Sequence, residues 1–295
     1  MFYIDSSSND PCFNIATEEF LLRESKEEFF MLYIDRPSVI VGKHQNAIAE
    51  INYKYVKENN IPVIRRISGG GTVVHDSGNL NFCYIANSRE GFQIDFKKYI
   101  QPIVDVLINK YGISAEIGAK NDIRVNGLKI SGNAEHVFKN RVLHHGTLLV
   151  SSNLHDLAQA LYIIPGKYID KAVKSIRSEV TNLSEINTSI EINSLKSTIK
   201  SDLKSIYEFE DYTLSTQELA FINNKIVEKF NTWKWNFGYS PSYIFRSETV
   251  ELLVENGIIV KAKIPASLPL EQIVIGKNHD YDVLKTITDK AWELF

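Results

Sequence analysis

The chain has few cysteines and no excess of charge of either sign. Its 295 residues include two cysteines, Cys12 and Cys83, and 33 basic side chains nearly balance 36 acidic ones, which leaves a formal net charge of −3. Two cysteines exclude a disulfide-stapled fold and fit a reducing compartment in which neither needs a partner. A nearly neutral chain has no overall field that would draw it to nucleic acid or to an anionic membrane, so we expect neither as a partner.

Features typical of exported, membrane and metal-binding proteins are also missing. No apolar run is long enough to span a bilayer, and residues 1–8 lack the basic start and apolar stretch of a signal peptide. The seven histidines and two cysteines show no paired ligand spacing, so we expect no structural metal. With 44% apolar and 23% charged residues, the composition is typical of a globular protein with a sizeable core. We therefore expect a cytoplasmic protein, and a monomer.

Three familiar nucleotide and hydrolase motifs are absent as well. There is no Gly-x4-Gly-Lys-Ser/Thr phosphate loop, and the glycines at 69–71 lack the spacing of a dinucleotide-binding turn. Any nucleotide must therefore be held in another way. Ser68 precedes a glycine, but no Gly-x-Ser-x-Gly elbow surrounds it, which disfavours a hydrolase nucleophile.

Helical and strand patterns alternate irregularly, which favours an α+β fold over a regular βαβ repeat. Strand patterns occur at 29–34, 39–41, 63–64, 72–75, 80–86, 122–125, 128–131, 135–138 and 142–145, and helical patterns at 14–22, 52–59, 96–108, 153–162 and from the capping box at 215–218 to 230. Asp95 and Gly112 stand where caps of the 96–108 helix are expected. Because several strands pair as hairpins, we expect a mixed, mostly antiparallel sheet flanked by helices.

The composition also indicates two units. Residues 233–241 resemble a boundary between a catalytic domain, 1–235, and a small carboxy-terminal α+β unit, 241–295. In the small unit, strand patterns flank Asn256-Gly257, and a final helix is expected from about residue 281 to residue 294. At roughly 55 residues this unit is near the lower limit of independent stability, so we expect it to lean on the main domain.

The most informative segment is Arg65-Arg66-Ile67-Ser68-Gly69-Gly70-Gly71-Thr72, which lies between two predicted strands. Glycine has no Cβ, so backbone N–H groups at 69–71 can approach a phosphate or carboxylate closely. Arg66 adds a positive charge beside them. The alternative is a merely flexible glycine turn, but the arginines and the flanking strands favour anion binding.

A second segment, about fifty residues on, carries a single lysine of interest. Asn126-Gly127 predicts a two-residue type I′ hairpin between 122–125 and 128–131. In that register Arg124 lies opposite Lys129 on one face, and the two like charges would repel unless an anion lay near them. The alternative is that Lys129 is an ordinary solvated surface lysine.

Two other residue types have competing interpretations. His144 and His145 are adjacent on a predicted strand, so their side chains point to opposite faces and cannot chelate one metal together. One of them is expected to face the site, and a structural role for either stays open. Cys83 alternates with aromatic residues in an apolar strand, which is more typical of a small buried side chain than of a nucleophile.

Taken together, the segments Arg65–Asn79, Asn121–Ala134 and His144–Leu149 resemble those of lipoate-protein ligases in order and spacing. The 120–129 portion is also similar to biotin protein ligases, which share the fold and the acyl-adenylate chemistry. The connector 174–183 resembles the family's as well, although Glu179 stands where a basic residue is expected. The resemblance covers residues 1–235 well and the shorter carboxy-terminal unit more loosely.

The resemblance implies a biotin/lipoate ligase-like fold and a two-step, ATP-dependent reaction. Lipoate or octanoate and ATP would give the acyl-AMP and pyrophosphate, and a lysine of an acceptor lipoyl domain would then attack the mixed anhydride. The acceptor would be a 2-oxoacid dehydrogenase E2 subunit or the glycine cleavage H protein. ATP and Mg²⁺ are the cofactors implied.

The resemblance also assigns roles to residues of this sequence. Lys129 would be the catalytic cation that bridges the carboxylate and the α-phosphate. Arg66, Gly70 and Gly71 would hold the acyl carboxyl end and the phosphates, and Asp122 would orient Mg²⁺ or Lys129. Further contacts are expected from Ser68, Thr72, His75, Asn79, Asn121, Ser131, His145 and Gly146, with Val39, Val41 and Val73 as apolar walls for the acyl chain.

Two other functions remain open at this stage. A cysteine-dependent octanoyl or lipoyl transferase of the same fold would need Cys83 or Cys12 as its nucleophile. A non-catalytic homologue would merely retain the lipoate site.

Overall fold

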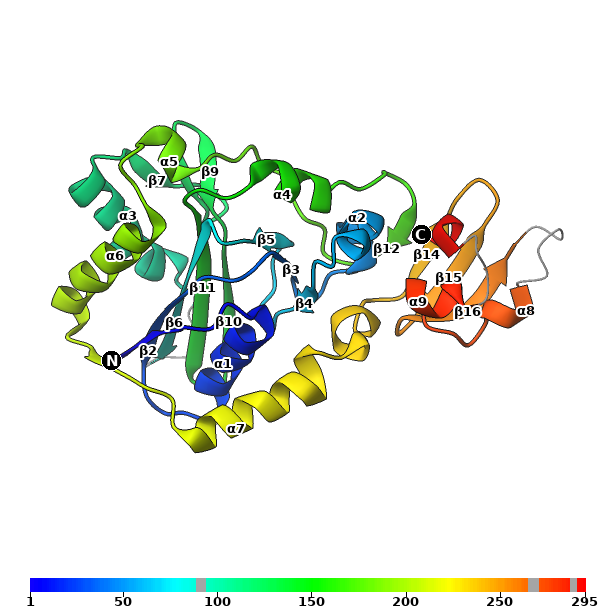
Figure 1. Ribbon diagram of the computed structural model, residues 1–295, viewed down its shortest axis with the longest axis horizontal. Coiled ribbons are helices and arrows are strands. Elements are labelled where there is room, and N and C mark those ends of the chain that lie inside the picture. Colours follow the sequence, from blue (N-terminus) through cyan, green and yellow to red (C-terminus); the bar gives the residue numbers. More distant parts are fainter. Residues whose placement is uncertain (89–93, 265–270, 287–290) are drawn as a thin grey trace.

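The computed structural model describes residues 1–88, 94–264, 271–286 and 291–295. A six-stranded sheet of strand order β10-β11-β6-β2-β1-β13 lies at the centre of the larger unit (Figure 1). Its strands are β1 (Phe2–Asp5), β2 (Phe29–Tyr33), β6 (Asn79–Asn87), β10 (Asn133–Phe138), β11 (Arg141–Leu149) and β13 (Glu210–Asp211). Strand β1 is parallel to β2 and to β13, and the other pairs are antiparallel. The predicted α+β fold with a mixed, mostly antiparallel sheet is therefore confirmed.

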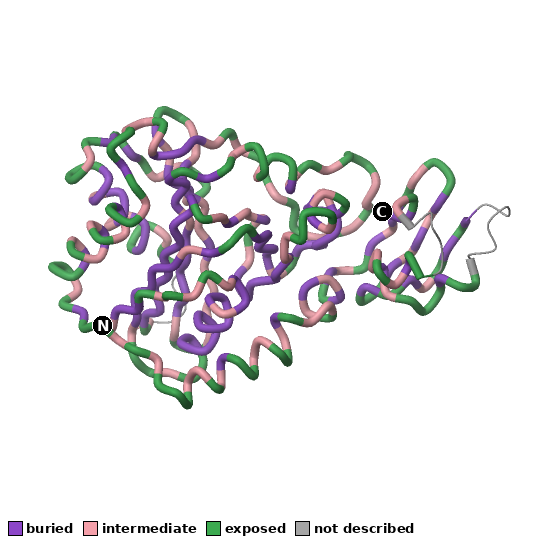
Figure 2. The backbone as a smooth tube through the Cα atoms, in the orientation of Figure 1, coloured by how far each residue is buried: buried purple, intermediate pink, exposed green. Residues whose placement is uncertain are grey.

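Helices cover both faces of this sheet, so its central strands are buried throughout. On one face, Phe30 and Phe82 pack against α3 (Phe96–Tyr111) and α6 (Ile192–Tyr207). On the other face, Met31 and Cys83 pack against α1 (Pro11–Arg23) and against α7 (Thr216–Lys225), which continues into η2 (Ile226–Phe230). Figure 2 shows the buried strands between these helix layers. The second face is the one that carries the site described below.

The helix ends follow the capping rules that the sequence indicated. Asp95 accepts a hydrogen bond from the Lys98 N–H at the start of α3, and Gly112 ends that helix with φ 65°. Ser215 and Glu218 form the predicted capping box of α7. The shorter helices of the larger unit are η1 (Ile48–Glu50), α2 (Tyr53–Glu58), α4 (Leu154–Ala160) and α5 (Leu183–Ile186).

Two three-stranded sheets carry the segments singled out in the sequence. Strands β3 (Ser38–Val41), β4 (Val63–Arg65) and β5 (Val73–His75) are ordered β4-β3-β5, with the glycine segment connecting β4 to β5. Strands β7 (Ala115–Ile117), β8 (Ile123–Val125) and β9 (Leu128–Ser131) form the other sheet. Asn126 and Gly127 have φ of 52° and 80°, as a type I′ turn requires, and Arg124 pairs with Lys129. The predicted hairpin and its register are confirmed.

The carboxy-terminal unit is a four-stranded sheet of order β12-β14-β15-β16. Its strands are β12 (Tyr168–Asp170), β14 (Tyr243–Arg246), β15 (Glu251–Glu255) and β16 (Ile258–Lys263), with the helices α8 (Glu271–Val274), α9 (Tyr281–Lys285) and η4 (Ala291–Leu294). The Asn256-Gly257 hairpin is confirmed. The expected helix 281–294 is described only at its two ends, because 287–290 lie outside the described residues. Strand β12 comes from the connector after α4 and was not predicted.

The segment expected as a boundary is fastened to the larger unit by Arg65. Residues Lys234–Gly238 form the π-helix η3, and the fully buried Arg65 guanidinium donates to the carbonyl oxygens of Trp235 and Asn236 and to those of Gly42, Lys43 and Gln45. Arg65 therefore joins η3 to the turn after β3. It does not serve as an anion ligand.

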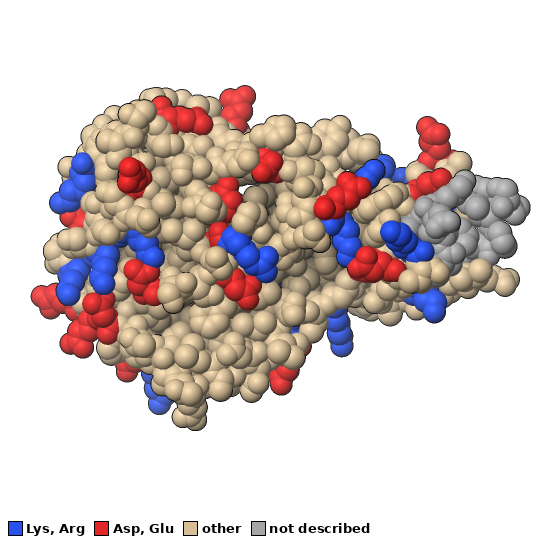
Figure 3. Space-filling model, in the orientation of Figure 1, with Lys and Arg blue, Asp and Glu red and all other residues tan. Residues whose placement is uncertain are grey.

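The end of the chain contacts α2 and the segment before β12. The rings of Tyr53 on α2 and Phe295 stack with centroids 4.7 Å apart, and Lys167 Nζ, next to β12, donates to the Phe295 carbonyl over 3.0 Å. None of the described helices is long and apolar enough to cross a membrane. Basic and acidic side chains are interspersed over the face shown in Figure 3.

Candidate functional site

Two adjoining cavities open beside the glycine loop, residues 66–72. The first has a volume of about 310 Å³ and is lined by the loop and by β5, β6, β9 and β11. The second, of about 460 Å³, lies between β9 and the segment 154–163. Both cavities are lined by Thr72, Val73, Lys129, Gly132, Thr147, Lys174, Ser175, Ile176 and Ser178. Lys129 therefore stands where the two cavities meet.

Arg66 closes the glycine loop on itself. Its Nε donates to Ser68 Oγ over 2.9 Å and its Nη1 to the Ile40 carbonyl over 3.0 Å, while Nη2 donates to the carbonyls of Gly69 and Gly71 over 2.6 and 2.7 Å. Four of the five guanidinium N–H groups are bound in this way, and one on Nη1 has no partner among the described residues. Burial lowers the pKa of Arg66 to about 10, which still leaves it charged at neutral pH. Arg66 lines the first cavity and orders the loop.

The loop's shape depends on glycine at two positions. Gly70 has φ 84°, a conformation that other residues rarely adopt, and a Cβ on Gly42 would lie 2.1 Å from the Gly70 carbonyl oxygen. The N–H of Thr72 donates to Ser175 Oγ over 2.9 Å. The N–H groups of Gly70 and Gly71 make no hydrogen bond within the described chain. These two donors are therefore available to an anion.

The hairpin brings a carboxylate and two cations together. Arg124 Nη2 forms an ion pair with Asp122 Oδ2 over 2.8 Å, so the Asp122 carboxylate offsets part of the like charges of Arg124 and Lys129. The buried Oδ1 of Asp122 has no partner among the described residues. Burial lowers the pKa of Lys129 and the Asp122 carboxylate opposes that shift. Lys129 is half-buried and forms no ion pair with a described residue, so it is not an ordinary surface lysine.

A chain of hydrogen bonds runs behind the loop to α1. His145 Nδ1 lies 2.8 Å from Glu18 Oε2, and His145 Nε2 lies 2.7 Å from Ser68 Oγ. Because an ionised carboxylate can only accept, His145 donates from Nδ1 to Glu18, and in the neutral imidazole Nε2 then accepts from the Ser68 hydroxyl. Tyr33 donates to the other oxygen of Glu18 over 3.0 Å. Of the two adjacent histidines, His145 faces the first cavity.

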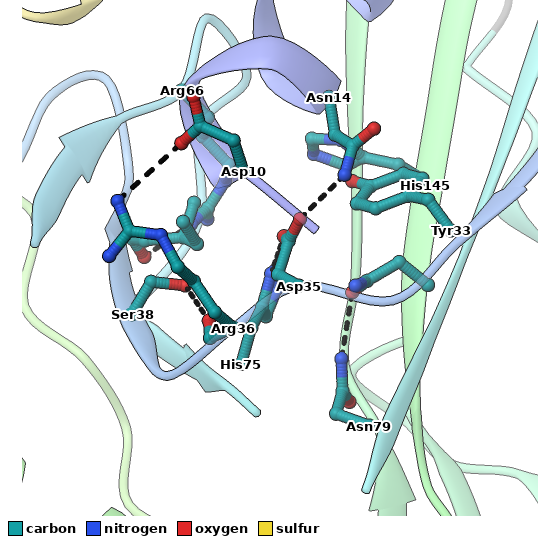
Figure 4. Close-up of polar contacts among 12 residues, drawn as sticks. Asp10, Asn14, Tyr33, Asp35, Arg36, Ser38, Arg66, His75, Asn79 and His145 are labelled. Atoms are coloured by element: carbon teal, nitrogen blue, oxygen red, sulfur yellow. Dashed lines mark hydrogen bonds and ion pairs between the residues drawn. The ribbon is translucent and has the colours of Figure 1, made fainter. Parts of the chain in front are cut away.

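A second carboxylate–histidine pair stands at the same cavity. Asp35 accepts from His75 Nδ1 over 2.8 Å and from Asn14 Nδ2 over 2.7 Å, and Figure 4 shows Asn14 and His75 both pointing toward it. His75 lines the cavity, whereas Asp35 is fully enclosed behind it. His144 lies on the opposite face of the sheet, bonded to Glu135 and surrounded by aromatic rings.

Most of the sequence-predicted site residues are brought together. The first cavity is lined by Lys129, Arg66, Gly70, Gly71, Thr72, His75, Asp122, His145 and Gly146. Ser68 lies directly behind His145, and Ser131 lines the second cavity. Asn121 and Asn79 line neither cavity: Asn121 is a turn residue with φ 58°, and Asn79 bonds to Asn81.

The apolar walls were predicted wrongly at two of three positions. Val39 and Val41 belong to the apolar cluster formed with the carboxy-terminal unit. The intervening Ile40 faces the cavity instead, since successive side chains of a strand point to opposite faces. Val73 lines the cavity as expected.

Several site residues were missed because no local motif marks them. Glu18 and Asp35 lie far from the glycine loop in the sequence, and the only signal was a carboxylate inside an apolar segment. Ser175 is bound by the Thr72 N–H and by Gln45 Nε2, so it fastens the connector to the loop. Glu179, noted as a departure, accepts from the Lys129 N–H through its backbone carbonyl, and its side chain lines the second cavity.

Neither cysteine is poised as a nucleophile. Cys83 is fully buried, and burial raises the pKa of its thiol well above the usual value. Burial also raises the pKa of Cys12 to about 12. Neither residue lines the first or the second cavity.

The comparisons with known sequences point to one family. Residues 10–204 match the model of the lipoyl protein ligase A/B catalytic domain. Lipoate–protein ligase 1 of Staphylococcus aureus is 38% identical, with 95% of this chain and 91% of that protein covered. The lipoate-protein ligase LplJ of Bacillus subtilis is 35% identical, with 98% and 94% covered.

Solved structures, a lipoate-protein ligase among them, have the same fold as this chain. LipL1 of Plasmodium falciparum, solved in complex with lipoate, has a TM-score of 0.68 at 26% identity, with 97% of this chain and 93% of that chain covered. A lipoate-protein ligase A bound with ATP also has a TM-score of 0.68, at 23% identity, with 81% and 98% covered.

Proposed function

The chain belongs to the lipoyl protein ligase A/B family, and we propose that it joins lipoate to a lysine of an acceptor protein by way of lipoyl-AMP. Lipoate and ATP give lipoyl-AMP and pyrophosphate. The amine of the acceptor lysine then attacks the acyl carbon, and AMP leaves. The observation that carries the proposal is the half-buried Lys129 ammonium, which forms no ion pair with a described residue and which lies where the two cavities meet.

The first cavity suits the acyl group. Ile15, Tyr33 and Ile40 line this cavity and not the second, and each is at most 2% exposed. Burying an alkyl chain there yields about 0.8 kcal/mol for each methylene. The carboxylate at the other end of the chain then lies toward Lys129 and the N–H groups of Gly70 and Gly71.

The second cavity suits the nucleotide. Half-buried apolar side chains from the segment 154–163 line one wall, among them Leu154, Leu157 and Ile163, and offer a surface for a flat base. Arg177 of the connector adds positive charge for phosphates, whereas Lys174, which lines the same cavity, is paired with Asp170. The α-phosphate would lie at the junction of the cavities, beside Lys129.

The first step requires charge stabilisation rather than a covalent nucleophile. A carboxylate must approach an α-phosphate that is already negative, so cations and N–H donors that are fixed in advance lower the barrier. The Lys129 ammonium is a compact charge that interacts with both reacting groups. Arg66 is held by its loop contacts, so its charge does not need to be reorganised during the reaction.

Magnesium is proposed as a companion of ATP, held in part by Asp122. Among the described residues, no group of three or more His, Cys, Asp or Glu side chains could hold a metal by itself. The unpartnered, buried Oδ1 of Asp122 fits the pattern of Mg²⁺, which takes one or two carboxylates together with substrate phosphates. The bound ion would neutralise part of the triphosphate charge.

In the second step the acceptor supplies the nucleophile. We assign lipoyl domains of E2 subunits or of the glycine cleavage H protein as acceptors, and octanoate as an alternative acyl substrate. The proposal places the reaction in the cytoplasm, where ATP is available, and has the enzyme act as a monomer. It divides the chain into a catalytic unit, 1–235, and an accessory unit, 241–295, to which β12 contributes a strand.

A cysteine-dependent transferase is the second candidate, and the cysteines weigh against it. A thiolate nucleophile needs a lowered pKa and access to the substrate, whereas both cysteines are buried and have raised pKa values. Cys83→Ser and Cys12→Ser should therefore retain ATP-dependent transfer.

The proposed function is tested by mass spectrometry of purified lipoyl domains after incubation with the enzyme, lipoate, ATP and Mg²⁺. We expect one acceptor lysine to gain a lipoyl group, and no gain when ATP is omitted. Transfer without ATP from an acyl-carrier protein would favour the transferase. No transfer to any acceptor would favour a non-catalytic lipoate-binding protein.

A further inference from the structure

The first cavity carries polar groups that a hydrocarbon tail would leave unpaired. Asn81 on β6 lies directly opposite Tyr33 on β2 and Thr147 on β11, and these three side chains line the first cavity in a row across the sheet. Asn81 is only 2% exposed. Tyr33 and Asn81 line the first cavity and not the second, so they belong to the cavity to which the proposed function assigns the acyl chain, and the inference rests on that assignment.

The side-chain amide of Asn81 has a polar atom without a hydrogen-bond partner among the described residues. Asn79 Nδ2 donates to Asn81 Oδ1 over 2.8 Å, a contact drawn in Figure 4. Asn81 Nδ2 and Asn79 Oδ1 are buried and have no partner among the described residues. Turning both amides over would exchange the two kinds of atom and leave the same deficit. Buried polar groups in native proteins are nearly always paired, so a buried amide facing a cavity indicates a ligand that completes the pairing.

His75 adds a second polar group to the same cavity. Asp35 fixes the imidazole because it accepts from Nδ1, while Asn14 holds the other oxygen of the Asp35 carboxylate. In the neutral imidazole, Nε2 is then an acceptor, and it has no partner among the described residues. The cavity therefore offers an amide and an imidazole nitrogen beside the apolar side chains of Ile15 and Ile40.

The two candidate acyl substrates differ in the chemistry of the tail. Octanoate ends in a methyl group, which can pair with neither polar group. The sulfur atoms of the lipoyl dithiolane are weak acceptors, and the thiols of its reduced form are weak donors. A tail that enters the cavity also displaces water from these groups, so only a tail with sulfur replaces part of the lost hydrogen bonding.

We infer that Asn81 recognises the sulfur-bearing end of the acyl group by donating from its amide to a dithiolane sulfur, and that the enzyme for this reason prefers lipoate to octanoate. Asn81 supplies the specificity because it faces the tail directly and lacks a partner. A site built to bond a polar group rejects the analogue without it more strongly than an apolar pocket rejects a change of size.

The test compares Asn81→Val with Asn81→Thr, which have nearly the same shape and differ by one hydroxyl group. Pyrophosphate release by the full-length enzyme gives kcat/KM for lipoate and for octanoate. We expect the ratio of kcat/KM for lipoate to kcat/KM for octanoate to exceed 1 in the wild type and to be similar in Asn81→Thr. In Asn81→Val the ratio should be lower by about fivefold or more, because only the threonine can form a hydrogen bond to sulfur. Thermal melting of both variants checks that they fold equally.

Ile40→Val serves as the control for cavity volume. It enlarges the same cavity without a change of polarity, so the expected ratio is that of the wild type. Equal ratios in Asn81→Val and Asn81→Thr would overturn the inference, as would a wild-type ratio of 1 or less, or a fall in Ile40→Val as large as that in Asn81→Val. If the wild type releases no pyrophosphate with either acid, the proposed function itself is wrong and the inference falls with it.

Discussion

Glutamine at position 18 is expected to destabilise the protein, although Glu18 belongs to none of the motifs that marked the site. The carboxylate accepts hydrogen bonds from Tyr33 and His145 and is the main charge that opposes the desolvation of Arg66. Glu18→Gln keeps the shape but removes the charge. It also places an amide N–H donor against either the Tyr33 hydroxyl or the His145 Nδ1–H, both of which are donors themselves.

The magnitude follows from the burial of this network. Glu18 is 1% exposed and Arg66 4% exposed, so the substitution leaves a buried guanidinium without the main negative charge that offsets its burial. Removing one member of a buried ion pair costs about 3–5 kcal/mol. Glutamine retains one acceptor, so we take the lower end, about 3 kcal/mol, which for a domain of this size lowers Tm by roughly 6–12 °C.

Thermal and urea unfolding of Glu18→Gln and of Glu24→Gln measure this effect. Glu24 is exposed at the end of the same helix, so its substitution is expected to change stability by less than about 0.5 kcal/mol. If Glu18→Gln melts within a degree or two of the wild type, the carboxylate does not balance Arg66, and the argument for an ordered loop is refuted.

Three further predictions concern the loop, the accessory unit and the cysteines. Gly70→Ala should lower adenylation and destabilise the fold by about 1–2 kcal/mol, because φ is 84° and a Cβ would lie 3.1 Å from the Arg66 guanidinium. A Cβ on Gly69 meets no atom within 4 Å, so Gly69→Ala should change neither pyrophosphate release nor thermal stability. Burial lowers the pKa of His279 to about 4, below the unfolded value of about 6.5. The unfolded chain therefore binds more protons between these values, and about 3 kcal/mol of stability that is present above pH 6.5 is lost as the pH falls toward 4; urea unfolding across this range should show that loss, and a flat profile would contradict it. Cys83→Ser and Cys12→Ser should keep ATP-dependent lipoylation in the mass-spectrometric assay, and loss of transfer with retained folding in either would favour the transferase.

Local rules were enough to predict the fold class and the two central segments. The Asn126-Gly127 turn fixed the hairpin register, and with it the position of Lys129, because a type I′ turn leaves no other pairing. The caps at Asp95 and Gly112 followed in the same way. In each case the determinant lies within a few residues of the feature it determines.

The missed features depend on contacts between distant segments. Strand β12 joins the accessory sheet only through pairing with β14, more than seventy residues later, and no local pattern specifies that partner. Glu18 reaches His145 only because α1 packs on the sheet face that carries β11. For Val39 and Val41, the wrong face of β3 was expected to line the cavity. Both faces of β3 are apolar, so only the assembled fold decides which face lines the cavity.

The central claim is that the Lys129 ammonium supplies the charge for adenylation, and Lys129→Met tests it most directly. Methionine keeps the length and apolar body of the side chain and removes only the charge. The decisive measurement is lipoate-dependent pyrophosphate release, with Lys225→Met, a half-buried lysine that lines neither cavity, as control. Loss of one preorganised electrostatic contact to the transition state predicts a decrease in kcat of about 10²–10³-fold, with Tm undiminished because no described residue pairs with Lys129. Adenylation by Lys129→Met within about threefold of the wild-type rate would contradict the account.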